Sequence, residues 1–293
     1  MFLILLSEFC YNYKRMKISK YVDSLGSFEN KKVVLIGATS GIGLELLKHL
    51  VSLKAQIILL ALEPDLSQKL KEEYNLLDVI HYDQSSNSSI ELAIDELLDK
   101  HKDFDTIVLN AGVLALRKIM DNGYSGTISI NYIGARYFID TISPKLSQNV
   151  RFVIAGSFAA GLRVKKNVDL KSPKLSNFDH YNISKAYLEA YFYKLAKERP
   201  YENLEYVCVE PGLVNTSIIR NYNKAIRFLG YYFLKWFFHS PRKASLGLLT
   251  GISSKVKNGD FITPRGLFHL SGYPKIRTLP KKRRREYLFT DGK

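Results

Sequence analysis

Short apolar runs alternate with longer amphipathic segments along most of the chain, beginning near Lys31. A continuous apolar run, such as the one at 56–62, is typical of a strand covered on both faces of a sheet. Apolar residues spaced three and four positions apart, as at 90–101, are typical of an amphipathic helix. The predicted strands are 33–37, 56–62, 77–83, 105–112, 150–157, 204–212 and 259–264, and the predicted helices are 41–53, 64–75, 90–101, 127–146 and 180–198.

The alternation predicts an α/β fold, a doubly wound parallel sheet of about seven strands with helices on both faces. Ligands of such sheets bind beyond the carboxyl ends of the strands, so we expect functional residues in the turns that follow them. We divide the chain into an N-terminal extension (1–30), a main domain (31–270) and a basic tail (271–293). The extension contains a second methionine, Met16, so translation starting at Met1 and translation starting at Met16 are both compatible with the sequence.

Composition narrows the class of protein. Hydrophobic residues make up 46% and charged residues 24% of the 293 positions, which excludes a disordered chain, a collagen and a coiled coil. The two cysteines, Cys10 and Cys208, are too few and too far apart for a disulfide scaffold, so we expect a reducing, cytoplasmic location. No apolar run approaches the roughly 20 residues of a membrane-spanning helix. The scattered histidines predict no metal site.

The net charge of +15 is concentrated at the C-terminal end, where residues 241–293 carry thirteen Lys/Arg against three Asp/Glu. A run of five cations at 281–285 could bind anionic lipid or an import receptor, or remain solvated. Without a nucleic-acid module we do not expect nucleic-acid binding. The aromatic, cationic segment 226–239 has three readings. It is a lid for a bulky, apolar substrate, a peripheral membrane contact, or a helix buried in the core or at a subunit interface.

The first strand is followed by the glycine-rich turn GATSGIG (37–43), which opens the first helix. Glycine permits a tight turn and lets the backbone approach a pyrophosphate closely. The N-terminus of the helix offers free N–H groups and a favourable dipole to phosphate. The turn therefore predicts a nucleotide site, although its GxxxGxG spacing on its own also fits a strand–helix turn without a ligand.

A tyrosine and a lysine on the 180–198 helix form the second chemical signal. Tyr181 and Lys185 are four residues apart, which puts them on one helix face. A tyrosine titrates near pH 10, and a neighbouring cation lowers that pKa. Such a pair predicts a general acid or base for a carbonyl or an alcohol. Because the helix carries three further tyrosines, the pair on its own is also compatible with a core position.

Three further motifs occur in order along the chain and strengthen the evidence from the glycine-rich turn and the Tyr181–Lys185 pair. NAG (110–112) ends the fourth strand, Ser157 ends the fifth, and PGLVNT (211–216) follows the sixth. Together these motifs resemble the short-chain dehydrogenase/reductase family in its compact single-domain form, over about residues 31–265. The resemblance implies a Rossmann-type fold, binding of NAD or NADP, and hydride transfer between the nicotinamide and a carbonyl or secondary alcohol. It also implies a homodimer or homotetramer.

The resemblance carries roles onto matching positions. Tyr181 would donate or accept the proton, Lys185 would also bind the nicotinamide ribose, and Ser157 would bind the substrate oxygen. Asn131 would support a water chain to the lysine, or merely bridge a helix kink. Asp83 would hold the adenine amino group, or merely cap a helix. The implied catalytic set is Asn131, Ser157, Tyr181 and Lys185, and the implied cofactor set is Gly37, Thr39, Ser40, Gly41, Ile42, Gly43, Asp83, Asn110, Ala111, Gly112, Tyr181, Lys185, Pro211, Gly212, Val214 and Thr216.

Some positions depart from the family pattern. Gly156 stands where a second serine is frequent, and the interval from Ser157 to Tyr181 is unusually long, so 161–180 either forms a loop that reaches the substrate or a solvated insertion. Ala61 and Leu62 occupy the usual cofactor-selecting positions, and the acidic Glu63 that follows favours NAD over NADP. Two alternatives to a dehydrogenase remain, a nucleotide-binding scaffold without turnover and a nucleotide-sugar epimerase.

Overall fold

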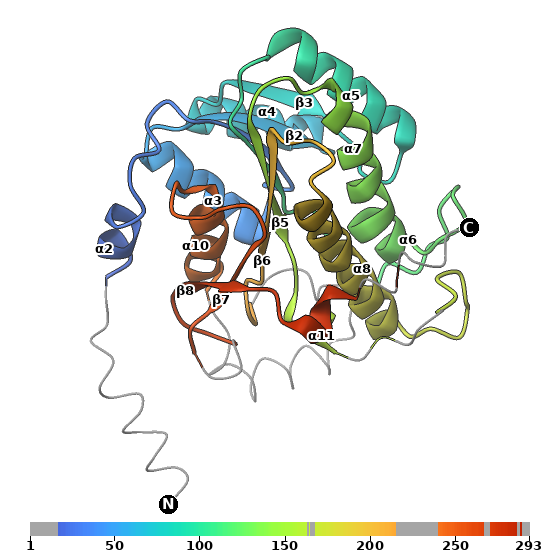
Figure 1. The fold of residues 1–293 in the computed structure, drawn as a ribbon. Coiled ribbons are helices and arrows are strands. Elements are labelled where there is room, and N and C mark those ends of the chain that lie inside the picture. Colours follow the sequence, from blue (N-terminus) through green and yellow to red (C-terminus); the bar gives the residue numbers. More distant parts are fainter. Residues whose placement is uncertain are drawn as a thin grey trace, which may run out of the picture.

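A single sheet organises the chain. The computed structural model describes residues 17–162, 164, 168–214, 240–266, 270–285 and 288. In these residues, eight strands pair in the order β3-β2-β1-β4-β5-β6-β7-β8 (Figure 1), and only β8 is antiparallel to its neighbour. The strands are β1 (Lys32–Ile36), β2 (Gln56–Ala61), β3 (Asp78–His81), β4 (Thr106–Leu109), β5 (Val150–Ala155), β6 (Leu204–Val209), β7 (Asp260–Pro264) and β8 (Pro274–Thr278).

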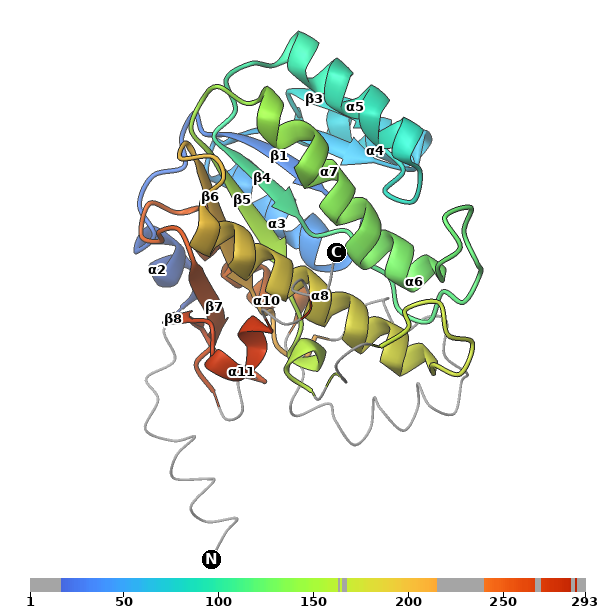
Figure 2. The ribbon, with the colours of Figure 1, turned by 45° about the vertical axis from the view of Figure 1, so that its right-hand side comes forward.

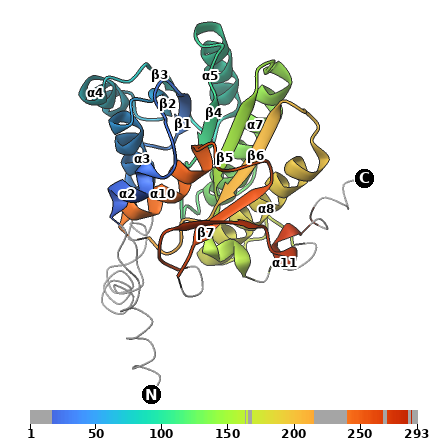
Figure 3. The ribbon, with the colours of Figure 1, turned by 60° about the vertical axis from the view of Figure 1, so that its left-hand side comes forward.

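Helices cover both faces of the sheet, as the alternation predicted. One face is covered by α2 (Ile18–Asp23), α3 (Gly41–Ser52), α4 (Pro64–Tyr74) and α10 (Pro241–Ile252). The other is covered by α5 (Asn87–Lys100), α7 (Ala135–Ile142) and α8 (Asn177–Glu198). Figures 2 and 3 show the two layers from either side. All seven predicted strands are present, and the α/β doubly wound class is confirmed.

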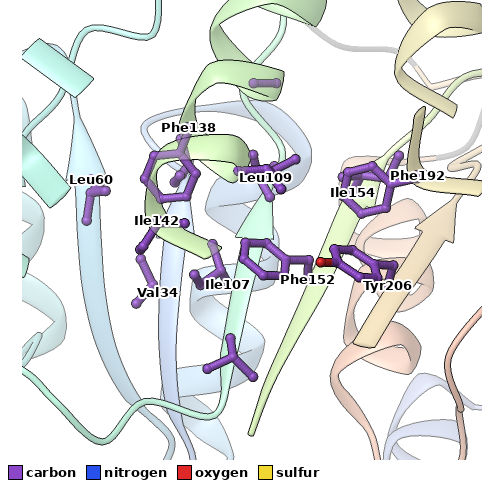
Figure 4. Packing of buried hydrophobic residues seen from close by; sticks show 14 of the residues in the cluster. Val34, Leu60, Ile107, Leu109, Phe138, Ile142, Phe152, Ile154, Phe192 and Tyr206 are labelled. Atoms are coloured by element: carbon purple, nitrogen blue, oxygen red, sulfur yellow. The ribbon is translucent and has the colours of Figure 1, made fainter. Parts of the chain in front are cut away.

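The strands are apolar throughout because alternate side chains enter different cores. In β1, the side chains of Val34 and Ile36 lie in the core between the sheet and helices α5, α7 and α8. The side chains of Val33 and Leu35 lie in the core on the other face, between the sheet and helices α3 and α10. Figure 4 shows side chains from α7 and from the central strands meeting in the first of these cores. There the rings of Phe152 and Tyr206 stack with their centroids 5.6 Å apart. Buried apolar side chains therefore pack against both faces of the sheet.

The helix expected at 127–146 is present, but its helical type changes along its length. It divides into α6 (Gly126–Ile128), a π-helical turn η1 (Ser129–Gly134), α7 and a 3-10 turn η2 (Ser143–Lys145). A Cβ on Gly134 would overlap the carbonyl oxygen of Gln84, so the wider turn lies directly against the loop that follows β3. π-helical turns of this kind occur frequently at functional sites.

Described secondary structure continues beyond both boundaries expected for the main domain. The sheet continues past the boundary expected at residue 270, because β8 pairs with β7 along its whole length. It is followed by a short helix, α11 (Lys281–Arg284). In the expected extension, α2 packs near α10, where the Tyr21 hydroxyl lies 2.8 Å from Thr250 Oγ1. Among the described residues, no helix is long and apolar enough to cross a membrane.

Part of the long interval between Ser157 and Tyr181 packs on the protein rather than extending into solvent. Val164, Val168, Leu170 and Leu175 contact a small buried cluster that includes Ile183 of α8. The described part of this interval is therefore not a fully solvated loop, and its contact with a substrate stays a prediction.

Candidate functional site

A cleft of about 280 Å³ opens at the carboxyl ends of β1, β2, β3 and β4. It lies at this edge because parallel strands all end on the same side of the sheet. Nine of the residues expected to bind the dinucleotide line it. They are Gly37, Thr39, Ser40, Gly41, Ile42, Asp83, Asn110, Ala111 and Gly112.

The glycine turn has the shape that brings a backbone close to a ligand. Gly37 has φ +81°, and a Cβ there would overlap the backbone of Ala111. Gly43 does not line the cleft, but a Cβ there would overlap the carbonyl oxygen of Gly37 and lie 2.7 Å from Asn110 Nδ2. Glycine is therefore required at both positions, in one case by the backbone angle and in the other by close contact.

The start of α3 supplies donors for an anion. Helix α3 begins at Gly41, and the first N–H groups of any helix have no partner within it. Ser40 precedes the helix, and its hydroxyl makes no capping bond, while Thr39 and Ser40 both line the cleft. Free N–H groups, hydroxyls and the positive end of the helix dipole fit a pyrophosphate. The residues present therefore fit a dinucleotide.

Asn110 and Asp83 also line the cleft. Asn110 Nδ2 donates to the carbonyl oxygen of Gly37 at 2.6 Å, which ties β4 to the glycine turn. One oxygen of Asp83, Oδ1, accepts bonds from the backbone N–H and the hydroxyl of Ser85 at 2.8 and 2.7 Å. The cap of α5 is Ser86 rather than Asp83, so capping does not explain the aspartate.

The candidate catalytic residues lie on α8 and at the end of β5. A capping box between Ser176 and Asp179 begins α8, which places Tyr181 and Lys185 in its second and third turns. Ser157 follows β5 and caps the 3-10 turn η3 (Phe158–Gly161) by accepting from Ala159 N at 3.2 Å. The side chains of Ser157 and Tyr181 form a hydrogen bond. Two residues that are 24 positions apart in the sequence are thus brought together.

The acidity of Tyr181 differs from the sequence expectation. Burial raises the pKa of its hydroxyl above 10, the hydrogen bond with Ser157 lowers it, and the charge of Glu189 raises it. The net effect is upward, because burial outweighs the lowering influence. The hydroxyl is therefore protonated at neutral pH, rather than poised to ionise.

Lys185 is buried beside the cleft. Its Nζ donates to the carbonyl oxygen of Ala155 at 2.8 Å. Burial lowers its pKa to about 8, although Glu189 and Cys208 counteract that effect. A Cβ on Gly112, which lines the cleft, would lie 3.3 Å from Lys185 Nζ. The ammonium group therefore lies next to Gly112 in the cleft wall and next to the carboxyl end of β5.

Asn131 lies in the π-helical turn and is fully buried. Its Oδ1 accepts from Val113 N at 2.8 Å, and its Nδ2 donates to Val113 O at 2.9 Å and to Ser184 Oγ at 3.1 Å. The side chain thus joins the helix bend to the strand-four loop and to α8. These contacts account for the burial of Asn131, and both the water chain and the bridging of a helix kink stay predictions.

The expected nicotinamide segment is only partly described. Pro211, Gly212 and Val214 follow β6 at the same edge of the sheet, and Gly212 has φ +80°. Leu213 N donates to Leu270 O at 3.0 Å, which joins this segment to the loop after β7. Thr216 and the aromatic segment 226–239 lie outside the described residues.

Two residues near the site were missed by the sequence reasoning. Gln84 lines the cleft and donates to the carbonyl oxygen of Ile130 at 2.6 Å, so it anchors the π-helical turn. Glu189 is fully buried and accepts from Ser157 N at 3.0 Å. Its position, four residues after Lys185 and eight after Tyr181, was a usable signal, because it puts all three on one helix face.

Comparison with known proteins agrees with this geometry. A benzil reductase from Saccharomyces cerevisiae that forms (S)-benzoin is 27% identical over 67% of this chain and 76% of its own length. A 3-oxoacyl-[acyl-carrier-protein] reductase from Chlamydia pneumoniae is 26% identical over 64% of this chain and 75% of its own. The structure of the Pseudomonas aeruginosa RhlG/NADP complex has the same fold, with a TM-score of 0.65 at 21% identity, covering 83% of this chain and 98% of that one.

A family model described as short chain dehydrogenase matches residues 31–227, which is more than half of the chain. The matched stretch contains the glycine turn, Ser157, Tyr181 and Lys185. This chain therefore belongs to the short-chain dehydrogenase/reductase family, whose members are oxidoreductases acting on CH–OH and C=O groups.

Proposed function

We propose that this protein reduces the carbonyl group of a small molecule with NADH, with Tyr181 as the proton donor. The observation that carries the proposal is the hydrogen-bonded pair of Ser157 and Tyr181 beside Lys185, at the edge of a cleft that fits a dinucleotide. A bound nicotinamide would supply the hydride, and the protein supplies position and proton.

Each side chain has a defined task in this proposal. Ser157 binds the carbonyl oxygen and Tyr181 delivers a proton to it, because a tyrosine with a raised pKa is fully protonated at neutral pH. In the reverse direction the same hydroxyl would have to lose its proton first. Lys185, with a pKa near 8, is still mainly cationic at neutral pH and stabilises the tyrosinate that remains after proton transfer.

The cleft favours NADH over NADPH. Among the described residues that line it there is no Lys or Arg, and Glu63 lies at its rim after β2. A carboxylate repels a 2′-phosphate, and the absence of a cation leaves that phosphate unpaired. The NADP in the RhlG structure shows what that relative binds, and the cleft composition of this chain points the other way.

Two titrations and one variant test the proposal. Fluorescence titration with NADH and with NADPH should show saturable binding with NADH tighter. Benzil and a 3-oxoacyl thioester, chosen from the names of the two relatives, are then offered as substrates. Tyr181→Phe should lower kcat about 10²- to 10⁴-fold while leaving the Kd for NADH unchanged, and Tyr193→Phe on the same helix should behave like wild type.

Three outcomes count against the proposal. Failure of a folded protein to bind either nucleotide would overturn the dinucleotide site. Tighter binding of NADPH would overturn the cofactor preference alone. Turnover that survives in Tyr181→Phe would overturn the role of the tyrosine.

A further inference from the structure

One guanidinium from the C-terminal segment is buried beneath the candidate active site. Arg283 belongs to α11, which contacts α8 and η3 (Figure 1). Its side chain is 6% exposed and lies between two carboxylates, Glu189 on α8 at 0% and Glu210 after β6 at 1% exposure. The run of cations expected as a basic tail thus contains a residue of the protein core.

The guanidinium is matched to its partners in detail. Arg283 Nη2 lies 2.7 Å from Glu189 Oε1, and Nε donates to Glu189 Oε2 at 3.0 Å. Arg283 Nη1 donates to the carboxylate of Glu210. Such bidentate, charge-assisted bonds fix geometry as well as charge. A lysine could supply the charge but not the planar fork.

The same ion pair holds the backbone of Ser157 from both sides. Arg283 Nη2 donates to the carbonyl oxygen of Ser157 at 2.8 Å. Glu189 Oε1 accepts from the N–H of Ser157 at 3.0 Å. Both polar backbone groups of the serine that hydrogen-bonds Tyr181 are therefore bound to a single buried salt bridge.

Gly156 completes this arrangement and explains a departure from the family pattern. A Cβ on residue 156 would overlap Glu189 Oε1 and would lie 3.1 Å from Cys208 Sγ. A serine, which is frequent at this position in the family, could not fit beside the buried carboxylate. Gly156, Glu189 and Arg283 are thus mutually dependent, and the ion pair occupies space that a side chain would otherwise fill.

We propose that Arg283 is a positioning residue for the carbonyl reduction, which fixes the Ser157 turn through Glu189 and through the Ser157 carbonyl oxygen. The inference rests on the proposed function, because positioning has a catalytic effect only if Ser157 and Tyr181 carry out the reaction. The C-terminal segment after β8 is, on this account, part of the active-site scaffold.

The test compares three substitutions in the full-length chain. Arg283→Lys keeps the charge and loses the fork, Arg283→Met loses both, and Lys282→Met removes an exposed cation from the same helix. For each, kcat, KM for the carbonyl substrate and Kd for NADH are measured. Hydrogen–deuterium exchange of the peptide that contains residues 156–162 is measured on the nucleotide-free protein.

For Arg283→Lys we expect kcat to fall about 10- to 100-fold, because small displacements of a catalytic group have effects of that size. The Kd for NADH should not change, since the nucleotide cleft is lined by other residues. Exchange at 156–162 should be faster than in wild type, while exchange in the distant strand β2 should be unchanged. Lys282→Met should match wild type in every measurement.

A purely structural role predicts a different pattern. Wild-type kcat and wild-type exchange at 156–162 in Arg283→Lys would overturn the proposal. So would exchange that rises equally in β2 and at 156–162, because that indicates a general loss of stability. If Arg283→Met does not fold, the kcat and the exchange at 156–162 of Arg283→Lys alone test the proposal. If the wild-type protein reduces no carbonyl, the proposed function fails. Faster exchange in Arg283→Lys that is confined to 156–162 would then still support the anchoring of the Ser157 turn by Arg283. Unchanged exchange in Arg283→Lys would overturn that anchoring.

Discussion

Lys185→Met should make the protein more stable while removing a candidate catalytic group. Lys185 is 4% exposed, and burial lowers its pKa from 10.5 to about 8 despite the opposing effects of Glu189 and Cys208. At about 1.36 kcal/mol per pKa unit, holding this cation in the folded state costs about 3 kcal/mol. Loss of its hydrogen bond to Ala155 O costs about 1 kcal/mol. We therefore expect the free energy of unfolding to rise by about 2 kcal/mol at neutral pH.

The lowered pKa of Lys185 determines how the stability gain of Lys185→Met should change with pH. The folded pKa lies below the unfolded one, so the folded state is penalised for as long as Lys185 is protonated. The penalty is complete below pH 8 and disappears as the pH rises from about 8 to 10.5. The advantage of Lys185→Met should therefore shrink over this range and be close to zero at about pH 9.5, where the remaining penalty roughly equals the lost hydrogen bond.

Urea denaturation of the nucleotide-free protein at neutral pH and at about pH 9.5 measures both effects. Lys194→Met is the matched control, because Lys194 is on the same helix with its side chain 40% exposed. Its effect should stay within about 0.5 kcal/mol at either pH. A Lys185→Met protein that is less stable than wild type at neutral pH would refute the reasoning, and so would a gain that is equal at both pH values.

Three further predictions concern the cleft and the sheet. Burial raises the pKa of Asp78, but hydrogen bonds, led by one from Lys71, lower it to about 2. Asp78→Asn should therefore cost about 2 kcal/mol at neutral pH, and urea denaturation should show this difference disappearing as the pH falls from about 4 to 2. Gly43→Ala should destabilise by about 1–3 kcal/mol and weaken NADH binding in a titration, because its Cβ displaces the Gly37 carbonyl. Glu63→Gln should raise NADPH affinity relative to NADH, and an unchanged ratio would exclude Glu63 from cofactor selection.

Much of the fold and of the candidate site could be predicted because the signals are local. Apolar runs flanked by segments of helical periodicity predicted seven strands at the right positions, because a strand buried on both faces consists of consecutive apolar residues. The glycine turn and the spacing of Tyr181 and Lys185 are also local, and they located the nucleotide cleft and the helix face. The expected homodimer or homotetramer stays a prediction.

The remaining features depend on contacts between distant residues. The π-helical turn within the 127–146 helix lies where Gly134 meets Gln84, and the raised pKa of Tyr181 arises from burial, which no motif encodes. Arg283 belongs to a run of five cations, and the sequence pattern of such a run predicts a solvated tail rather than a buried residue.

The order of elements, the family and the residue types at the site could all be inferred from the amino-acid sequence, because they follow from short-range patterns. Three-dimensional contacts were needed to show that β8 continues the sheet and that Arg283 is buried between Glu189 and Glu210 against the Ser157 turn. The physical reason is that a buried charge is tolerated only where partners converge on it, and those partners come from 94 and 73 positions away in the chain.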